Sequence, residues 1–149
     1  MTIRSFWDFL RRAGQAYAAC QKPLLREFSL TAAEADVLMF LANNPSCDTA
    51  AQISSIRRIP KSQVSLSVHS LADRGLLTCE MRGGNRKSVH LAPSPDAAPV
   101  IARGHAVQQS FAEVLFAGFT EAEKAEFSRL HDKLAANLAN IGDDLSCRP

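Results

Sequence analysis

Apolar residues recur at steps of three and four along most of the chain, a spacing that predicts helices. The first stripe runs from Ile3 to Leu24 and predicts an amphipathic helix that is interrupted or ends near Pro23. Residues 29–45 predict a second helix, because Thr31 and Glu34 have the spacing of a capping box. Its inward stripe is predicted to be Ala33, Val37 and Leu41.

Two helices joined by a short link are predicted next. The first covers residues 48–59 and is capped by Asp48 or Thr49, with three inward residues: Ala50, Ile53 and Ile56. The second covers residues 61–74, where Val64, Val68 and Leu71 fall on one face. A short helix followed closely by a second one is typical of a helix-turn-helix pair.

The pattern changes after Gly75. Residues 76–81 and 87–91 predict two strands that pair around a glycine-containing turn. A long helix is expected to start within residues 92–99, with Pro99 in its first turn. A second capping box, Thr120 with Glu123, predicts a last helix. Its apolar residues follow a near-heptad spacing: Phe127, Leu130, Leu134, Leu138, Ile141 and Leu145. One thin chain cannot bury so many apolar stripes, so we expect helices shared between two copies.

The outer face of the helix over residues 61–74 is unusually rich in short polar side chains. Its exposed positions are predicted to be Lys61, Ser62, Gln63, Ser65, Leu66 and His69, beside Asp73. The second helix of a helix-turn-helix enters the DNA major groove, where its first residues reach base edges. Gln63 can pair with adenine, Lys61 with guanine or phosphate, and Leu66 with a thymine methyl. A plain solvated surface is the alternative interpretation.

The charge is unevenly distributed along the 149 residues. The whole chain carries a net +2, but residues 57–87 hold seven bases against two acids, a local +5. Residues 96–144 hold four bases and eight acids, a local −4. A basic middle segment indicates a face that binds a polyanion, although charge that only keeps the protein in solution gives the same count.

The turn between the two strands gathers basic and polar side chains. Arg82, Asn85, Arg86 and Lys87 lie in or beside it. A narrow minor groove attracts an inserted arginine, so we expect Arg86 there and Arg82 and Lys87 on phosphates. An ordinary charged turn is the alternative.

Taken together, these segments resemble the MarR family of bacterial winged-helix regulators. The resemblance is carried by "LTAAEADVLMFLANN", by "KSQVS…L…RGLL" and by the "NRKSVHL" wing, and it covers nearly the whole chain. Relatives commonly have Asp-Arg-Arg in the wing, where this chain has Asn85-Arg86-Lys87. The resemblance therefore implies a minor-groove role for Arg86 and no aspartate that could orient it.

The resemblance implies a mainly α fold with a small β-hairpin wing. We expect one MarR-like domain over residues 1–149, with dimerisation helices in 1–29 and 95–149 and a winged helix-turn-helix in 30–94. It also implies a homodimer that binds a pseudo-palindromic operator. Many relatives release DNA when a small aromatic or phenolic ligand binds between the two parts.

The functional prediction is a homodimeric repressor of transcription that binds double-stranded DNA and is released by a small molecule. One alternative is a redox-sensing regulator acting through Cys20, which lies near Tyr17 and Lys22. Cys20 packed as a small apolar residue is the simpler interpretation of that position. Another alternative is a winged-helix module that binds a protein and no nucleic acid.

Several classes of protein are not supported by the sequence. The sequence has no nucleophile with an activating base, no phosphate-binding loop and no dinucleotide fingerprint, so we expect no enzyme and no cofactor. Its scattered cysteines and histidines lack metal-ligand spacing, so no metal site is expected. It also lacks a membrane span and a signal peptide, which predicts a cytoplasmic location.

Overall fold

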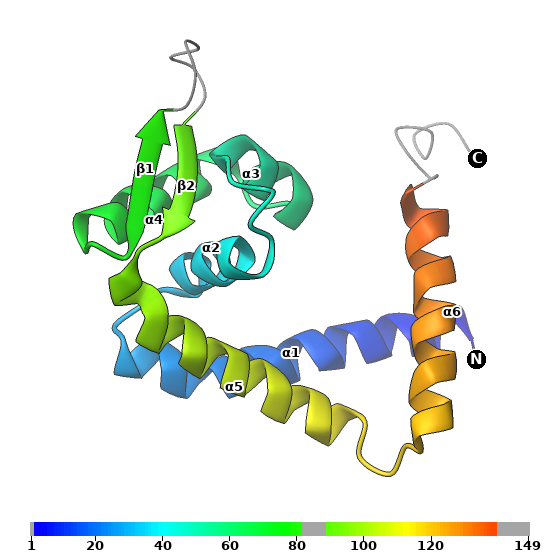
Figure 1. The fold of residues 1–149 in the computed structure, drawn as a ribbon. Coiled ribbons are helices and arrows are strands. Elements are labelled where there is room, and N and C mark those ends of the chain that lie inside the picture. Colours follow the sequence, from blue (N-terminus) through cyan, green and yellow to red (C-terminus); the bar gives the residue numbers. More distant parts are fainter. Residues whose placement is uncertain (1, 82–88, 140–149) are drawn as a thin grey trace. The chain divides into compact units, whose positions relative to one another are not determined.

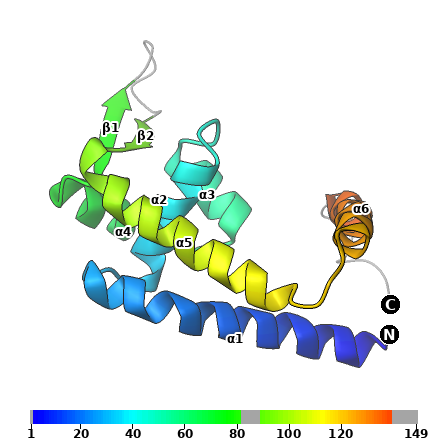
Figure 2. The ribbon, with the colours of Figure 1, turned by 60° about the horizontal axis from the view of Figure 1, so that its bottom comes forward.

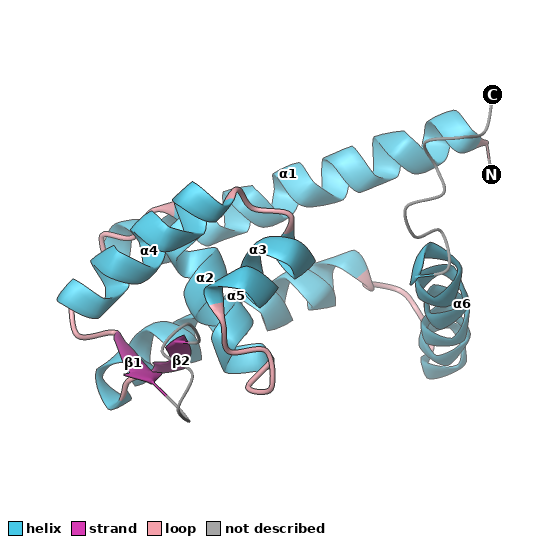
Figure 3. Ribbon diagram, turned by 90° about the horizontal axis from the view of Figure 1, so that it is seen from above, coloured by secondary structure: helices cyan, strands magenta, loops and turns pink. Residues whose placement is uncertain are grey.

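The computed structural model describes residues 2–81 and 89–139 and shows helices with one small sheet (Figures 1 and 3). The elements in chain order are α1 (Ile3–Glu27), α2 (Ala32–Asn43), α3 (Ala50–Arg57), α4 (Lys61–Asp73), β1 (Leu77–Met81), β2 (Val89–Pro93), a 3-10 turn (Pro95–Ala97), α5 (Ala98–Leu115) and α6 (Glu121–Ala139). This order confirms the predicted fold class, which was mainly α with a β-hairpin wing.

The chain forms two compact units. The first ends at Phe111 and the second begins at Ala112, so the boundary falls within α5. The described core lies in the first unit, where α2, α4 and the hairpin pack around fully buried side chains. The largest of these are Leu24, Leu38, Leu41, Ile53, Leu71, Val37 and Val64.

Helix α1 continues through Pro23, so the expected break there is wrong. Proline lacks an N–H and removes one helical hydrogen bond, which normally ends or kinks a helix. Here Leu24 follows directly and is 1% exposed, and Leu25 also packs against the core. Burial of these two side chains stabilises the last turn enough for the helix to reach Glu27.

The end of α1 has the hydrogen bonds of a Schellman motif. Leu30 N–H donates to the Leu25 carbonyl over 2.9 Å, and Ser29 N–H donates to the Arg26 carbonyl over 3.3 Å. The residue after the C-cap must adopt a left-handed backbone for both bonds to form. Ser29 is that residue, and its φ is 50°. Glycine is usual at this position because its missing Cβ avoids a steric cost, and this chain uses serine instead.

Helix α2 is buried on more sides than its sequence pattern predicts. The capping box of Thr31 and Glu34 is present as expected. Val37 and Leu41 are buried, but Ala33 is only half-buried. Four further side chains complete the buried surface: Ala35, Leu38, Met39 and Phe40. A helix surrounded by other elements buries nearly its whole circumference, and a single predicted stripe misses that.

Helices α3 and α4 follow the predicted pair closely. Thr49, not Asp48, caps α3 and shares a capping box with Gln52. Ile53 is fully buried, but Ile56 is 55% exposed, so its predicted inward position is wrong. The helix ends at Arg57, one residue after Ile56, and its contacts with the core come from Ile53 and Ala50.

The hairpin pairs β1 with β2 in antiparallel register, Leu77 opposite Pro93 and Met81 opposite Val89. One backbone hydrogen bond joins the loop before α3 to this sheet. Leu91 N–H donates to the Asp48 carbonyl over 2.7 Å, so residue 48 lies along β2. The base of the hairpin is thereby attached to the helix-turn-helix.

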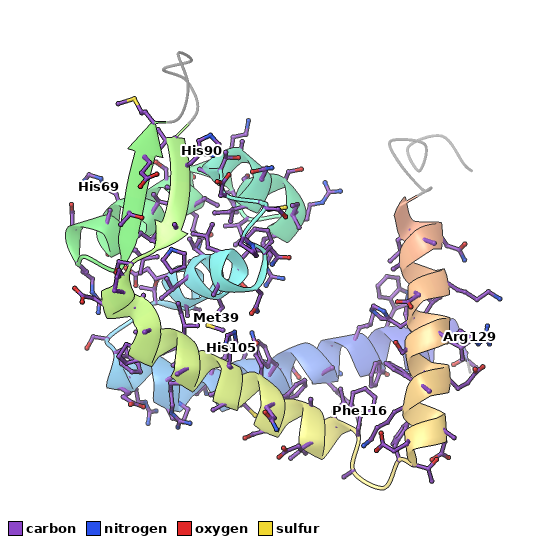
Figure 4. All side chains as sticks on the ribbon, in the orientation of Figure 1. Met39, His69, His90, His105, Phe116 and Arg129 are labelled. Carbon is purple, nitrogen blue, oxygen red and sulfur yellow. The ribbon has the colours of Figure 1, made fainter. Side chains whose placement is uncertain are left out.

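Helix α5 carries Pro99 in its first turn, as predicted. Its part up to Phe111 lies beside α1 (Figure 2), with the Tyr17 and Phe111 ring centroids 5.3 Å apart. It also crosses α2 at Gly104, where a Cβ would lie 2.3 Å from the Met39 sulfur. Met39 lies between the two helices (Figure 4), so a side chain at residue 104 would require the flexible end of Met39 to move.

Helix α6 begins with the predicted capping box of Thr120 and Glu123. Its predicted apolar row is exposed in the single chain: Phe127 42%, Leu130 46%, Leu134 52% and Leu138 69%. The last two predicted members of the row, Ile141 and Leu145, lie outside the described residues. Within residues 2–81 and 89–139, none of the helices combines the length and the apolar character that a membrane crossing requires.

A buried carboxylate joins α2 to α4. Glu34 is 7% exposed, and one of its oxygens accepts the Thr31 N–H over 2.6 Å. The other oxygen accepts the hydroxyl of Ser70 on α4. Burial alone would raise the pKa of Glu34, but the bonds from Ser70 and Thr31, with the charge of Arg74, bring it below the usual value. Glu34 is therefore ionised at neutral pH and fixes α4 against the start of α2.

We expect Glu34→Gln to lower the free energy of unfolding by about 1–2 kcal/mol at pH 7, because a neutral amide replaces a charged acceptor. The folded pKa lies below the unfolded value of 4.5, so the carboxylate stabilises the protein above that pH. This contribution disappears as pH falls through the folded pKa. Urea unfolding at pH 7 and at a pH below 4 should show the gap between wild type and variant narrowing.

Glu123→Gln is the matched control, because Glu123 makes the same capping-box contacts but is exposed on α6. It should change stability much less than Glu34→Gln. An equal loss in both variants, or a gap that widens on acidification, would contradict this account of Glu34.

Candidate nucleic-acid interface

A tight link sets α3 against α4. Residues 58–60 connect the helices, and Arg58 adopts a left-handed backbone with φ 54°. The Ser54 hydroxyl donates to the Ile59 carbonyl over 2.8 Å and closes the link. Pro60 is the N-cap residue of α4, and the helix starts without a side-chain cap because proline has no side-chain oxygen that could accept a hydrogen bond.

Helix α4 buries one side and exposes the other. Val64, Ser67 and Leu71 are buried against the core, and Val68 is half-buried. The structure exposes all six predicted contact residues, which we call the α4 outer face: Lys61, Ser62, Gln63, Ser65, Leu66 and His69. Leu66 is 72% exposed, a large value for a leucine with no described partner surface. The predicted inside and outside of this helix therefore agree with the structure.

His69 lies toward the C-terminal half of the α4 outer face (Figure 4). Its Nε2 is 3.6 Å from a carboxylate oxygen of Asp73, one turn further along. Beside it, side chains of α4 and Cys79 of β1 line a shallow hollow of about 290 Å³. Ser65 and Leu66 line the same hollow, whereas Lys61, Ser62 and Gln63 at the start of the helix do not.

The four predicted contacts in the wing, Arg82, Asn85, Arg86 and Lys87, lie outside the described residues. The base of the wing is described, and it contains a side-chain contact that the sequence did not predict. His90 Nδ1 lies 2.9 Å from both carboxylate oxygens of Asp48 (His90 is labelled in Figure 4). These residues are 42 positions apart, and no periodic signal connects them. Together with the Leu91–Asp48 backbone bond, the pair fixes the base of the wing to the loop before α3.

Four of the seven bases in residues 57–87 are described, and two of these four form contacts within the fold. Arg57 on α3 pairs with Asp36 on α2, its Nε 3.1 Å from the carboxylate. Arg74 donates to the backbone carbonyls of Phe28 and Ser29. The net charge counted over residues 57–87 therefore overstates the positive charge that is available on the surface. Arg58 and Lys61 are exposed beside the start of α4, and neither forms an ion pair with a described residue.

Cys20 is exposed on α1, and the predicted apolar stripe does not bury it. Cys79 is exposed on β1, and Cys47 is half-buried against the core. Over the described part of the chain, no three His, Cys, Asp or Glu side chains are close enough together to hold a metal ion.

A cavity of about 190 Å³ lies in the first unit among α1, α2, α5 and the end of α3. Aromatic and apolar side chains share its wall with amides and one ion pair. The lining residues are Tyr17, Gln21, Asp36, Met39, Phe40, Asn43, Asn44, Arg57 and Gln108. The sequence does not predict this cavity, because its lining residues come from four separate helices.

Comparisons of the sequence and of the fold with known proteins indicate the same family. Residues 28–88 match the model of the MarR family. No curated protein matches the chain significantly. Many solved structures share its fold, at sequence identities that support likeness of fold only.

Three of these structures illustrate the likeness. The transcriptional regulator PA3341 is 23% identical, covers 91% of this chain and 98% of its own, and has a TM-score of 0.78. A MarR-family regulator from Listeria monocytogenes, solved with a 26mer DNA, is 21% identical, covers 97% and 91%, and has a TM-score of 0.75. BpsR from Bordetella bronchiseptica, whose DNA binding is regulated by 6-hydroxynicotinic acid, is 22% identical, covers 88% and 98%, and has a TM-score of 0.67.

The matched segment contains α2 to α4 and the first strand of the hairpin, β1, and it ends directly before β2. Regulators of this family are transcription factors and not enzymes, in agreement with the sequence-based prediction. Residues 28–88 therefore match the MarR family of transcriptional regulators, and the fold of the chain is similar to that of solved regulators from this family.

Proposed function

We propose that the protein is a homodimeric repressor that binds a pseudo-palindromic DNA operator and releases it when a small molecule binds. In this proposal residues 30–94 form the winged helix-turn-helix, and residues 1–29 and 95–149 form the dimerisation part. The repressor role means that the bound operator overlaps a promoter, and in vitro transcription with and without the protein tests that role.

The α4 outer face is the observation that carries the proposal. Six side chains that can contact the edges of DNA bases are exposed on α4, the second helix of a helix-turn-helix. An amide at Gln63 can pair with adenine, and a cation at Lys61 can pair with guanine or phosphate. The similar Listeria regulator was solved with DNA, which supports the same use of this fold here.

We expect Gln63→Ala to weaken binding to a selected operator by about 1–3 kcal/mol and to relax base preference at one position of each half-site. The operator would first be obtained by selection from random double-stranded DNA. Fluorescence anisotropy with that operator, and with each single-base variant of it, measures both effects.

Gln15→Ala is the matched control, because Gln15 is also an exposed helical glutamine but lies on α1. It should leave operator affinity unchanged. Wild-type protein that binds no DNA at low salt would refute the proposal and favour a winged-helix module that binds protein.

The homodimer is supported by apolar side chains that neither compact unit buries. On α1 these are Trp7, Phe9 and Leu10, and on α6 they are Phe127, Leu130, Leu134 and Leu138. Monomeric proteins rarely expose so continuous an apolar row. A second copy of the chain, with the same rows, is the partner we propose.

We expect Leu134→Glu to convert the dimer to a monomer, because a charge would be buried in the interface. Operator affinity should fall at least about 100-fold, since two half-sites would no longer be bound together. Light scattering after gel filtration gives the mass. Lys133→Glu, the neighbouring exposed charge change, should leave the dimer intact. Wild-type protein that is monomeric would contradict the proposal directly.

The effector would bind in the cavity of about 190 Å³ that Tyr17, Phe40 and Gln108 help to line. Aromatic side chains suit a flat ring, and the amides suit its polar edge. The similar protein BpsR responds to 6-hydroxynicotinic acid, a ring compound of this kind.

We expect Gln108→Leu to raise about tenfold the concentration of 6-hydroxynicotinic acid, or of a phenolic ligand, that releases the operator. Operator affinity without ligand should not change. Gln109→Leu alters the next residue, which does not line the cavity, and should behave as wild type. If both variants change the required ligand concentration equally, the cavity is not the effector site.

A thiol-based alternative through Cys20 has one observation in its support, the exposure of that side chain. Operator release by peroxide in wild type, and its loss in Cys20→Ser, would establish this alternative.

A further inference from the structure

The C-terminal end of α4 is attached to the end of α1 by one side chain. Arg74 follows the last residue of α4 and directs its guanidinium group to the turn after α1. Its Nη2 donates to the Phe28 carbonyl over 2.6 Å, and its Nη1 donates to the Ser29 carbonyl over 3.0 Å. A planar guanidinium with two parallel donors fixes direction as well as distance.

These two carbonyls are suited to a cation. They directly follow α1, whose C-terminal end carries partial negative charge from the helix dipole. The Schellman bonds occupy the carbonyls of Leu25 and Arg26, so those of Phe28 and Ser29 remain for Arg74. Arg74 therefore completes the hydrogen bonding of the α1 terminus with a group that belongs to α4.

A second attachment lies one turn earlier on α4. Ser70 donates its hydroxyl to the buried carboxylate of Glu34, which also binds the backbone at Thr31. The end of α4 is thus attached by side chains to the α1 terminus and to the start of α2. The other end of α4 has no side-chain cap and carries the first residues of the outer face.

We infer that Arg74 is a positioning residue, which transmits the direction of α1 to α4 and so sets the distance between the two recognition helices of the dimer. This inference rests on the proposed function. Helix α1 has 25 residues and is about 37 Å long, so a small tilt along it produces a large displacement at its far end. Arg74 touches no DNA in this account and acts through the orientation of α4.

The test compares Arg74→Met with Arg103→Met. Both variants remove an exposed arginine that binds near the end of α1, but Arg103 belongs to α5 and pairs with Glu27 over 3.3 Å. Binding would be measured on the selected operator and on versions with one base pair added or removed between half-sites. Arg74→Met should reduce the preference for the correct spacing about three- to tenfold, and Arg103→Met should leave it unchanged.

A second readout needs no DNA. A spin label at Ser62→Cys, in a background without the native cysteines, reports the distance between the two α4 helices of the dimer by double electron–electron resonance. Arg74→Met should broaden that distance distribution, and Arg103→Met should not. If Arg74→Met does not fold, Arg74→Lys serves instead, because lysine keeps the charge but cannot bind both carbonyls in a planar fork.

Unchanged spacing preference and unchanged distances in the Arg74 variant would overturn the inference, as would equal changes in both arginine variants. Failure of the proposed function is recognised separately, because wild-type protein would then bind no operator. A wild-type protein that is a dimer but binds no operator still allows the distance measurement, which then decides the role of Arg74, whereas a monomeric wild type overturns both the proposed function and this inference.

Discussion

Helix α4 must bury one side in the core while the opposite side stays exposed to solvent. The packing and the polar contacts of the first unit hold the helix in this orientation. Val64 and Leu71 are fully buried, whereas Leu66 between them is largely exposed. Apolar burial holds the helix in place but gives little directional control, because it is roughly proportional to area. The direction comes from Glu34 and Ser70, whose hydrogen bond tolerates only a narrow range of geometry.

The polar contacts around α4 divide into two groups with different roles. Glu34 is buried and hydrogen-bonded at both oxygens, so it contributes to stability as well as to orientation. Arg74 is exposed, where charge-assisted contacts contribute little free energy but still restrict geometry. The Asp48–His90 pair belongs to the wing and attaches it to the same helix-turn-helix. The protein thus positions its candidate interface mainly by polar contacts between elements.

Local order was predictable from the sequence, and long-range pairing was not. Capping boxes at Thr31 and Thr120 depend on residues three apart, and both were identified correctly. The α4 outer face followed from helical periodicity alone. By contrast, Arg57 binds Asp36 across 21 positions, and Arg74 binds Phe28 across 46. The local charge of the sequence includes both arginines in the face that would bind a polyanion. Positions along the chain do not show that each arginine is engaged in a long-range contact within the fold. The break expected at Pro23 failed for a related reason, since burial of Leu24 outweighs the local preference of proline.

The crossing of α2 and α5 at Gly104 links two positions that lie far apart in the sequence. A methyl group at residue 104 would overlap the Met39 sulfur, so any larger residue there requires a different side chain, or a different rotamer, at position 39. Met39 also forms part of the cavity wall. A substitution at residue 104 would therefore displace or replace the Met39 side chain and change the shape of the cavity from a position that does not line it.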